Sequence, residues 1–340
     1  MIIKSINLTN FRNHDTYRLE CHQNTSLILG KNGSGKTSVL EAIYISTRGK
    51  SFRASDHEII KNGTEFYRIE LEYSSGEKIL ITYDGNNKIF LILDKKSKRL
   101  PKKHQYPIVL FLPSDLNLIS HAPSRRRDYF DRVFSEFDEN YNQNLLKYEK
   151  SLKQRNEILK NEFITQDSLF SWNLLLAKYG TKLFNSRQKF IQEINQELTK
   201  TYRSIAENAD EIEIFYKSEA SGLSESKYLN ILEENFQKDL LIKHTSFGVH
   251  HDDYVFYFNH KIADGSASRG ETRSIILALK FIEANLIYDK QHKKPIILLD
   301  DVFSELDPTR RRCLIKNFRN HQVIITSVED FQDNQSSQTA

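Results

Sequence analysis

Alternating apolar and polar positions dominate the first part of the chain and predict β-strands. Residues 1–8 and Ser26–Leu29 fit this pattern, and a helix is expected from Lys36 to about Ser46. Between about residues 65 and 95, strand patterns are separated by turn-forming sequences rich in Ser, Gly, Asn and Asp. These strands, Tyr67–Tyr73, Lys78–Tyr83 and Lys88–Leu93, predict an antiparallel β-meander.

The pattern changes to a helical one from about Ser124 to Asn208. Apolar side chains recur every three or four residues from Leu169 to Ile205, which is the spacing of one helix face. We expect a helix hairpin with its turn at Asn161–Ser168. Its longest helix, of about 36 residues, would span roughly 54 Å at the usual rise per residue.

Strands and helices then follow in mixed order. Strands are expected at Glu211–Tyr216, Tyr254–Phe258, Ile296–Leu299 and Val323–Ile325, and helices at Thr272–Tyr288 and Thr309–Phe318. We therefore predict that the helical block, residues 116–239, forms an arm inserted into a head made of residues 1–115 and 240–335. Residues 336–340 are polar and are expected to form a disordered tail.

Composition limits the class of protein. The 340-residue chain has 39% hydrophobic and 28% charged residues and a net charge of +4, which is typical of a globular protein and permits a nucleic-acid partner without requiring one. Two cysteines are too few for a disulfide scaffold or a four-cysteine zinc site. No apolar run approaches the ~20 residues that cross a bilayer, and the N-terminus lacks the layout of a signal peptide. We expect a cytoplasmic protein with no membrane partner.

A phosphate-binding loop lies between the second predicted strand and the first helix. Its sequence matches G-x-x-x-x-G-K-[ST] at every position, with Gly30, Lys31, Asn32, Gly33, Ser34, Gly35, Lys36 and Thr37. Glycines allow backbone N–H groups to converge on phosphates, Lys36 reaches the terminal phosphates, and the Thr37 hydroxyl ligates Mg²⁺. These residues predict an ATP site.

Two adjacent carboxylates complete the predicted site. The apolar run Ile296–Leu299 reads as a buried strand, and Asp300 and Asp301 follow at its carboxyl end. There Asp300 can hold Mg²⁺ and Asp301 can polarise the attacking water. The alternative is that the two acids cap the next helix.

A third element indicates the class of ATPase. Ser268-Arg269-Gly270-Glu271, ahead of the helix at Thr272–Tyr288, resembles the S-x-G-[QE] signature of ATP-binding cassette ATPases. Ser304-Glu305-Leu306-Asp307 resembles their D-loop, and Thr326 stands where transporters carry a switch histidine. In that class Ser268 and Gly270 contact the ATP of the opposite subunit. Ser268 with Glu271 is also a helix-capping pair, and both interpretations hold together.

Several further motifs make the chain resemble the RecF family of bacterial recombination-mediator ATPases. They extend from Met1 to about Glu329 and are not needed for ATP binding: Leu8-Thr9-Asn10-Phe11-Arg12-Asn13, Phe111-Leu112-Pro113-Ser114-Asp115-Leu116, Pro123-Ser124-Arg125-Arg126-Arg127, Leu152-Lys153-Gln154-Arg155-Asn156 and Gly248-Val249-His250-His251-Asp252-Asp253. The resemblance implies an α/β fold, an ABC/SMC-like P-loop ATPase head with an antiparallel β subdomain and an inserted helical arm. It also adds Arg12 to the expected ATP-binding residues.

The same resemblance implies a function in DNA recombination, repair and replication. An ATP-induced homodimer would clamp duplex or gapped DNA without reading sequence and, with RecR and RecO, promote RecA loading. ATP hydrolysis would be weak, DNA-dependent and used as a switch, with Lys36, Ser268 and Asp301 as catalytic residues. The chain departs from the family at Arg269 and Glu271, where Gln is usual.

A DNA-contact surface is less well defined by the sequence. Six basic residues follow the meander and suit phosphate contacts, although they also suit an ordinary solvated loop: Lys95, Lys96, Lys98, Arg99, Lys102 and Lys103. The cluster His250–Asp253 is expected to be structural and not a metal site, because no second ligand cluster matches it. Two alternative functions are an ATPase whose main partner is protein and a scaffold that binds ATP without hydrolysing it.

Overall fold

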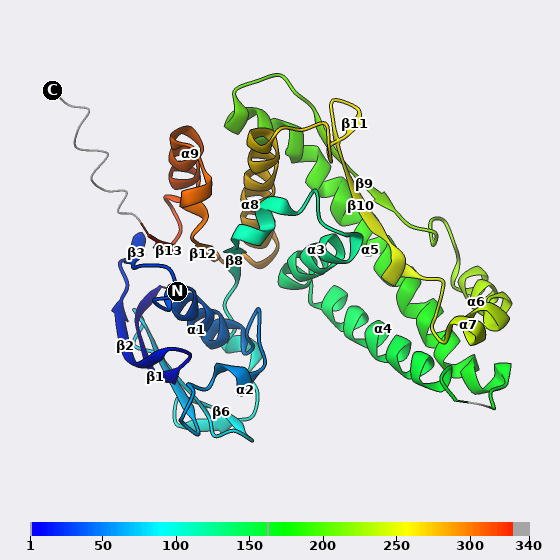
Figure 1. Ribbon diagram of the computed structural model, residues 1–340, viewed down its shortest axis with the longest axis horizontal. Coiled ribbons are helices and arrows are strands. Elements are labelled where there is room, and N and C mark those ends of the chain that lie inside the picture. Colours follow the sequence, from blue (N-terminus) through cyan, green and yellow to red (C-terminus); the bar gives the residue numbers. More distant parts are fainter. Residues whose placement is uncertain (1, 162, 329–340) are drawn as a thin grey trace. The chain divides into compact units, whose positions relative to one another are not determined.

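The structure, a computed structural model, describes residues 2–161 and 163–328, and Figure 1 follows its elements along the chain. Packing divides it into two compact units. Unit 1 holds the described residues up to Asp115 and those from Ile287 onwards, whereas unit 2 is Leu116–Leu286. The boundary predicted between head and arm, near residue 115, coincides with a boundary between the units. Residues 240–286, which were predicted to belong to the head, pack with unit 2. The division into compact units does not show which residues form the ATPase head, so the predicted head and arm stay a prediction. The predicted tail at 336–340 lies outside the described residues.

An antiparallel sheet forms one layer of unit 1. Its strand order is β2-β1-β4-β5-β6-β7, from β1 (Ile3–Phe11), β2 (His14–Glu20), β4 (Tyr67–Tyr73), β5 (Lys78–Tyr83), β6 (Lys88–Ile92) and β7 (Lys95–Ser97). Along β4, the residues Tyr67, Ile69, Leu71 and Tyr73 are buried while those between them are partly or fully exposed. This two-residue period gives the sheet one core face and one solvent face, as the meander pattern predicted.

A parallel sheet forms the second layer of unit 1. Its order is β3-β13-β12-β8, from β3 (Thr25–Leu29), β8 (Ile108–Phe111), β12 (Ile296–Asp300) and β13 (Val323–Ser327). Helix α1 (Lys36–Arg48) packs against strands of both sheets, and Val39, Leu40 and Ile43 are fully buried in their common core. Parallel pairing brings the carboxyl ends of β3, β13 and β12 to one edge. Helices α2 (Asp56–Ile59) and α9 (Pro308–Phe318) complete this unit, with the short turns η1 (Lys102–His104) and η4 (Val302–Glu305).

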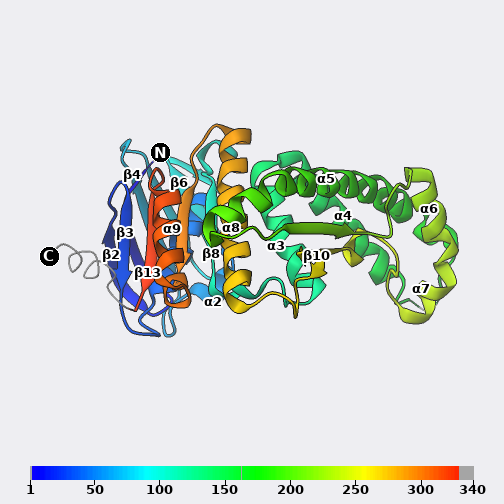
Figure 2. The same cartoon turned by 90° about the horizontal axis from the view of Figure 1, so that it is seen from above.

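Unit 2 contains the helical block. Helices α3 (Pro123–Phe137), α4 (Glu139–Ile158) and α5 (Gln166–Ala206) precede the sheet β11-β10-β9, which consists of β9 (Ile212–Lys217), β10 (Asp253–Phe258) and β11 (Lys261–Ile262). The shorter elements are α6 (Glu225–Glu234), α7 (Phe236–Ile242), η2 (Pro113–Asn117), at the boundary of the units, and η3 (Val249–His251). Helix α8 (Arg269–Gln291) begins in unit 2 and ends in unit 1. Figure 2 shows α4 and α5 side by side, as a helix hairpin requires.

Buried polar groups fix the helices of unit 2. Arg155 is fully buried on α4 and donates to Asp239 of α7, Asn173 of α5 and the Thr245 hydroxyl, each at 2.7 Å. A buried guanidinium is tolerated only when its donors are satisfied. The family motif around Arg155 therefore has a structural explanation.

Some elements differ from the sequence-based expectation. Helix α5 has 41 residues instead of about 36, because it begins after a capping box at Thr165 and Ser168 inside the expected turn. Strand β2 was not expected, since it is an edge strand whose side chains are all partly or fully exposed. Strand β8 was also missed, because four residues that are all buried show no alternation.

Candidate nucleotide site

The predicted phosphate loop connects β3 to α1 in a conformation that requires glycine. Gly33 and Gly35 have φ angles of 81° and 93°, and α1 begins at the next residue, Lys36. A Cβ atom on Gly35 would also lie 2.4 Å from the Nε2 atom of His14. The β1–β2 hairpin covers the loop here, because Asn13 donates its side-chain amide to the Gly33 carbonyl at 2.9 Å.

Lys36 lies over the loop that precedes it. Its ammonium group donates to the carbonyl oxygens of Gly30 at 2.6 Å and Lys31 at 3.0 Å. These contacts hold a positive charge above backbone N–H groups at the start of α1, where an anion is favoured. This is the position that the predicted role in binding terminal phosphates requires.

Thr37, in the first turn of α1, contacts Asp300 at the carboxyl end of β12. The Thr37 hydroxyl lies 2.8 Å and 3.0 Å from the two carboxylate oxygens of Asp300, which is only 7% exposed. Thr326, opposite Asp300 on β13, donates its hydroxyl to the same carboxylate at 2.9 Å. A hydroxyl and a carboxylate are the hard oxygen donors that Mg²⁺ takes together with substrate phosphates. The residues present therefore fit Mg²⁺.

Asp301 follows the strand in a left-handed conformation, with a φ angle of 49°. Its Oδ1 atom is buried and has no hydrogen-bond partner among the described residues. Burial raises the pKa of Asp301, and the neighbouring Asp300 and Glu305 carboxylates add to this while Lys36 opposes it. A carboxylate with a raised pKa and an open acceptor atom is suited to accept a proton from water.

Two arginines are fixed on one buried carboxylate. Glu41 of α1 is fully buried and accepts hydrogen bonds from Arg12 at 2.8 and 3.0 Å and from Arg53 at 2.8 and 3.0 Å. Burial raises the pKa of Glu41, but the bonds from Arg12, Arg53 and Ser51 outweigh this effect and hold it below its usual range. Two guanidinium groups against one carboxylate leave a net positive charge. Sequence reasoning predicted Arg12 but missed Arg53 and Glu41, which belong to no motif that it used.

These groups line one cavity within unit 1. It has a volume of about 530 Å³, and its walls include Arg12, Arg53, Gly33, Gly35, Lys36, Thr37 and Asp301. The cavity is therefore bordered by cations, by loop backbone and by the carboxylate residues Glu58 and Asp301, and its cations and loop suit a nucleoside triphosphate. The structure brings these predicted residues together, and their catalytic roles stay predictions.

The predicted signature residues begin α8. The Ser268 backbone N–H donates to the Glu271 carboxylate at 2.6 Å, and the Glu271 N–H donates to the Ser268 hydroxyl at 3.3 Å. This capping box confirms the structural interpretation of the pair. The predicted contact of Ser268 and Gly270 with the ATP of a second subunit stays a prediction. Both residues belong to unit 2, whereas the nucleotide cavity lies within unit 1.

The remaining candidates are placed as follows. The six predicted DNA-contact residues are exposed, on β7, on η1 and between them, and their role stays a prediction: Lys95, Lys96, Lys98, Arg99, Lys102 and Lys103. The histidine cluster makes contacts within the fold, since His250 bonds to the Tyr148 hydroxyl at 2.7 Å and Asp253 pairs with Arg126 at 2.7 Å, and its expected structural role stays a prediction. Residues 2–161 and 163–328 contain no group of three or more His, Cys, Asp or Glu side chains arranged to hold a metal. No described helix is both long and apolar enough to cross a membrane.

Comparison with known proteins agrees with this geometry. The family model described as an AAA ATPase domain matches residues 1–327. A solved structure, described as the recombination mediator protein RecF with ATP in the RecFOR pathway, is 30% identical and superposes with a TM-score of 0.86 over 97% of this chain and 93% of its own. An SMC head bound to the C-terminal winged-helix domain of ScpA shares only the fold, at 14% identity and a TM-score of 0.53 over 97% of this chain and 90% of its own.

A curated relative identifies the family. The DNA replication and repair protein RecF of Clostridium perfringens is 34% identical over 97% of this chain and 94% of its own length. The expected fold, an SMC-like ATPase head with an antiparallel sheet and a helical insertion, is confirmed by these likenesses. With this identity over nearly the full length of both proteins, the chain belongs to the RecF family of DNA replication and repair proteins.

Proposed function

We propose that this chain is an ATP-dependent DNA-binding protein of recombinational repair and replication. Its ATP-bound form is a homodimer that clamps duplex DNA at a single-strand gap. The observation that carries the proposal is a cavity lined by Lys36, Thr37 and Asp301, with Asp300 bonded to Thr37, in a member of the RecF family.

The charged and hydroxyl side chains of the nucleotide site have distinct roles in hydrolysis. Lys36 exchanges its two loop carbonyls for the terminal phosphate oxygens of ATP. Thr37 and Asp300 hold Mg²⁺, which when bound supplies positive charge to the phosphates. Asp301 orients the attacking water and accepts its proton at Oδ1, which has no hydrogen-bond partner among the described residues. Arg12 and Arg53, which also line the cavity, stabilise negative charge on the nucleotide.

The dimer and its partners rest on the class of protein. In cassette ATPases the signature residues act on the nucleotide of the opposite subunit, so Ser268 and Gly270 serve the ATP of a second copy. ATP binding then closes the dimer on DNA, and slow, DNA-stimulated hydrolysis releases it. The solved relative is described within the RecFOR pathway, which supports RecR and RecO as partners and RecA loading as the outcome.

The test is ATP turnover with and without gapped duplex DNA, measured together with dimer formation by light scattering. We expect DNA to raise turnover and to stabilise the ATP-dependent dimer. If DNA changes neither quantity, the main partner is protein and the proposal is wrong. An absence of turnover under both conditions would identify a scaffold that only binds ATP.

A further inference from the structure

Two basic segments from distant parts of the sequence lie side by side in unit 1. Strands β8 and β12 are parallel, with Ile108 opposite Ile296, and the Ile296 N–H donates to the Pro107 carbonyl at 3.0 Å. The residues that enter β8 therefore run beside those that enter β12. The first segment is residues 103–106 and the second is residues 292–294.

These segments line a cavity of about 410 Å³, which we call the basic hollow. Its lining residues are Lys103, His104, Gln105, Tyr106, His292, Lys293 and Lys294. Lys103, Lys293 and Lys294 are exposed, and none of the three forms an ion pair with another described residue. Of the lining residues, His104 lies beside a carboxylate, that of Glu77, at 2.6 Å. The basic hollow therefore carries positive charge that its own surroundings do not neutralise.

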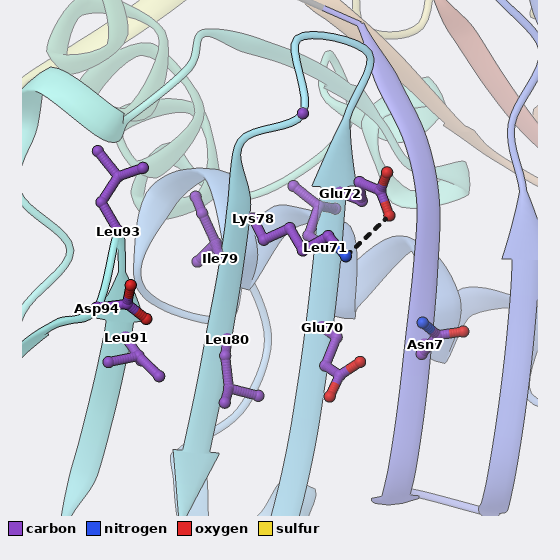
Figure 3. A pocket seen from close by; sticks show the side chains of 11 residues that line it. Asn7, Glu70, Leu71, Glu72, Lys78, Ile79, Leu80, Leu91, Leu93 and Asp94 are labelled. Atoms are coloured by element: carbon purple, nitrogen blue, oxygen red, sulfur yellow. Dashed lines mark ion pairs between the residues drawn. The ribbon is translucent and has the colours of Figure 1, made fainter.

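A second cavity of similar size has the opposite character. Figure 3 shows this cavity, of about 460 Å³, on the antiparallel sheet, with Leu80, Leu91 and Leu93 beside the carboxylates of Glu70, Glu72 and Asp94. Its lysine, Lys78, already pairs with Glu72 at 3.6 Å. Carboxylates repel a phosphate, so this cavity does not suit an anionic ligand, unlike the basic hollow.

We propose that the basic hollow binds the phosphate backbone of DNA. The inference rests on the proposed function and extends it to the residues that hold the DNA. Lys103 belongs both to the basic hollow and to the exposed basic segment Lys95–Lys103, so the hollow adds Lys293 and Lys294 to the cations of that segment. A series of separate exposed cations matches a repeating charge such as a nucleic-acid backbone, whereas a single phosphate is usually held by converging backbone N–H groups.

A structural role would explain the same lysines differently. Lys293 and Lys294 follow the last residue of α8, Gln291, and cations near the carboxyl end of a helix stabilise it. In that case their removal would lower the thermal stability of the protein and leave DNA affinity unchanged.

The experiment compares three full-length proteins in ATP and Mg²⁺: wild type, a hollow variant and a control variant. The hollow variant carries Lys103→Gln, Lys293→Gln and Lys294→Gln. The control removes three exposed lysines of the same unit away from the basic hollow, by Lys4→Gln, Lys78→Gln and Lys316→Gln. Affinity for gapped duplex is measured by fluorescence anisotropy between 50 and 300 mM salt, with ATP affinity and melting temperature as folding controls.

We expect the hollow variant to reduce the slope of log affinity against log salt by about one for each lysine that contacts a phosphate. Its affinity at physiological salt should fall about a hundredfold if all three do so. ATP affinity and the melting temperature should stay those of wild type, and the control should retain wild-type slope and affinity.

Three results would overturn the inference. The first is a hollow variant with wild-type slope and affinity, whether or not its melting temperature changes. The second is equal loss in the control, which would assign the effect to net charge. The third is tight, stoichiometric binding of inorganic phosphate that the hollow variant abolishes while DNA binding persists. A wild-type protein that binds no DNA in ATP would instead refute the proposed function itself.

Discussion

Replacing Glu41 with Gln tests whether one buried carboxylate holds both arginines of the nucleotide cavity. Gln keeps the size of the side chain but removes its charge, and it offers one acceptor oxygen in place of two. Five donor contacts from Arg12, Arg53 and Ser51 converge on Glu41, at 2.6 to 3.0 Å. The variant therefore leaves at least one guanidinium N–H group facing an amide N–H₂ group.

The expected cost follows from burial. Removing one partner of a buried ion pair costs about 3–5 kcal/mol. The Glu41 side chain is fully buried, but those of Arg12 and Arg53 are 21% and 37% exposed and recover part of their hydration. We therefore expect a loss of about 3 kcal/mol in the free energy of unfolding of unit 1. ATP affinity should fall as well, because neither arginine keeps a fixed orientation.

The assay must report on unit 1. The one tryptophan of the chain, Trp172, lies on α5 of unit 2, so its fluorescence reports the unfolding of unit 2. The unfolding of unit 1 is taken from the part of the far-UV circular dichroism transition in urea that does not follow the fluorescence. The control is Glu72→Gln, which removes a carboxylate paired with Lys4 at the surface and should leave the unfolding midpoint unchanged. A Glu41→Gln protein with the wild-type midpoint would refute the reasoning.

The pKa of Glu41 adds a pH dependence to this prediction. Because its folded pKa lies below the ordinary value of 4.5, the carboxylate stabilises the fold above that pH. This contribution is lost as the pH falls from 4.5 through the lower folded pKa. The difference in stability between wild type and Glu41→Gln should thus be constant near neutral pH and shrink below pH 4.5. A difference that instead grew in acid would contradict the assigned cause.

Four other changes separate the predicted roles. Lys36→Met should abolish nucleotide binding by titration calorimetry, and retained tight binding would remove Lys36 from the site. Asp301→Asn should keep ATP affinity but lower turnover by at least about a hundredfold, and near-normal turnover would exclude it as the base. Ser268→Arg should bind ATP yet fail to dimerise in light scattering, and normal dimerisation would refute the two-copy site. Gly248→Ala should destabilise unit 2 to urea, because its φ angle is 137° and a Cβ atom would lie 2.5 Å from the Tyr148 and Tyr228 hydroxyls; an unchanged Trp172 fluorescence transition would contradict that clash.

Features formed by residues that are neighbours in the sequence could be predicted from the sequence alone. The loop from Gly30 to Thr37 carries its own glycines, strand and helix, so both its structure and its chemistry could be predicted. The meander was predicted for the same reason, because each turn lies between the strands that it joins. Asp300 and Asp301 were found because they directly follow an apolar strand.

Residues brought together by the tertiary fold were harder to predict. Arg12 and Arg53 meet at Glu41 from 29 and 12 residues away, without a spacing that marks them as partners. The basic hollow needs the pairing of β8 with β12, and β8 itself was missed. The sequence shows that Lys293 and Lys294 are adjacent, but it does not show that they line one cavity with Lys103.

The parallel strand order also explains how a single threonine connects the two halves of the nucleotide site. Strand β13 lies between β3, which leads into the phosphate loop, and β12, which ends at Asp300. Fully buried Thr326 donates its hydroxyl to the Asp300 carboxylate at 2.9 Å and accepts the Asp301 N–H at 2.9 Å. Transporters of the cassette class carry a histidine at this position, which titrates near neutral pH, whereas a threonine hydroxyl does not. Thr326 is therefore able to orient the Asp300 carboxylate and to fix the Asp301 backbone, but its hydroxyl cannot take up a proton as a histidine can, so the predicted base of this chain is the Asp301 carboxylate, whose Oδ1 atom has no hydrogen-bond partner among the described residues.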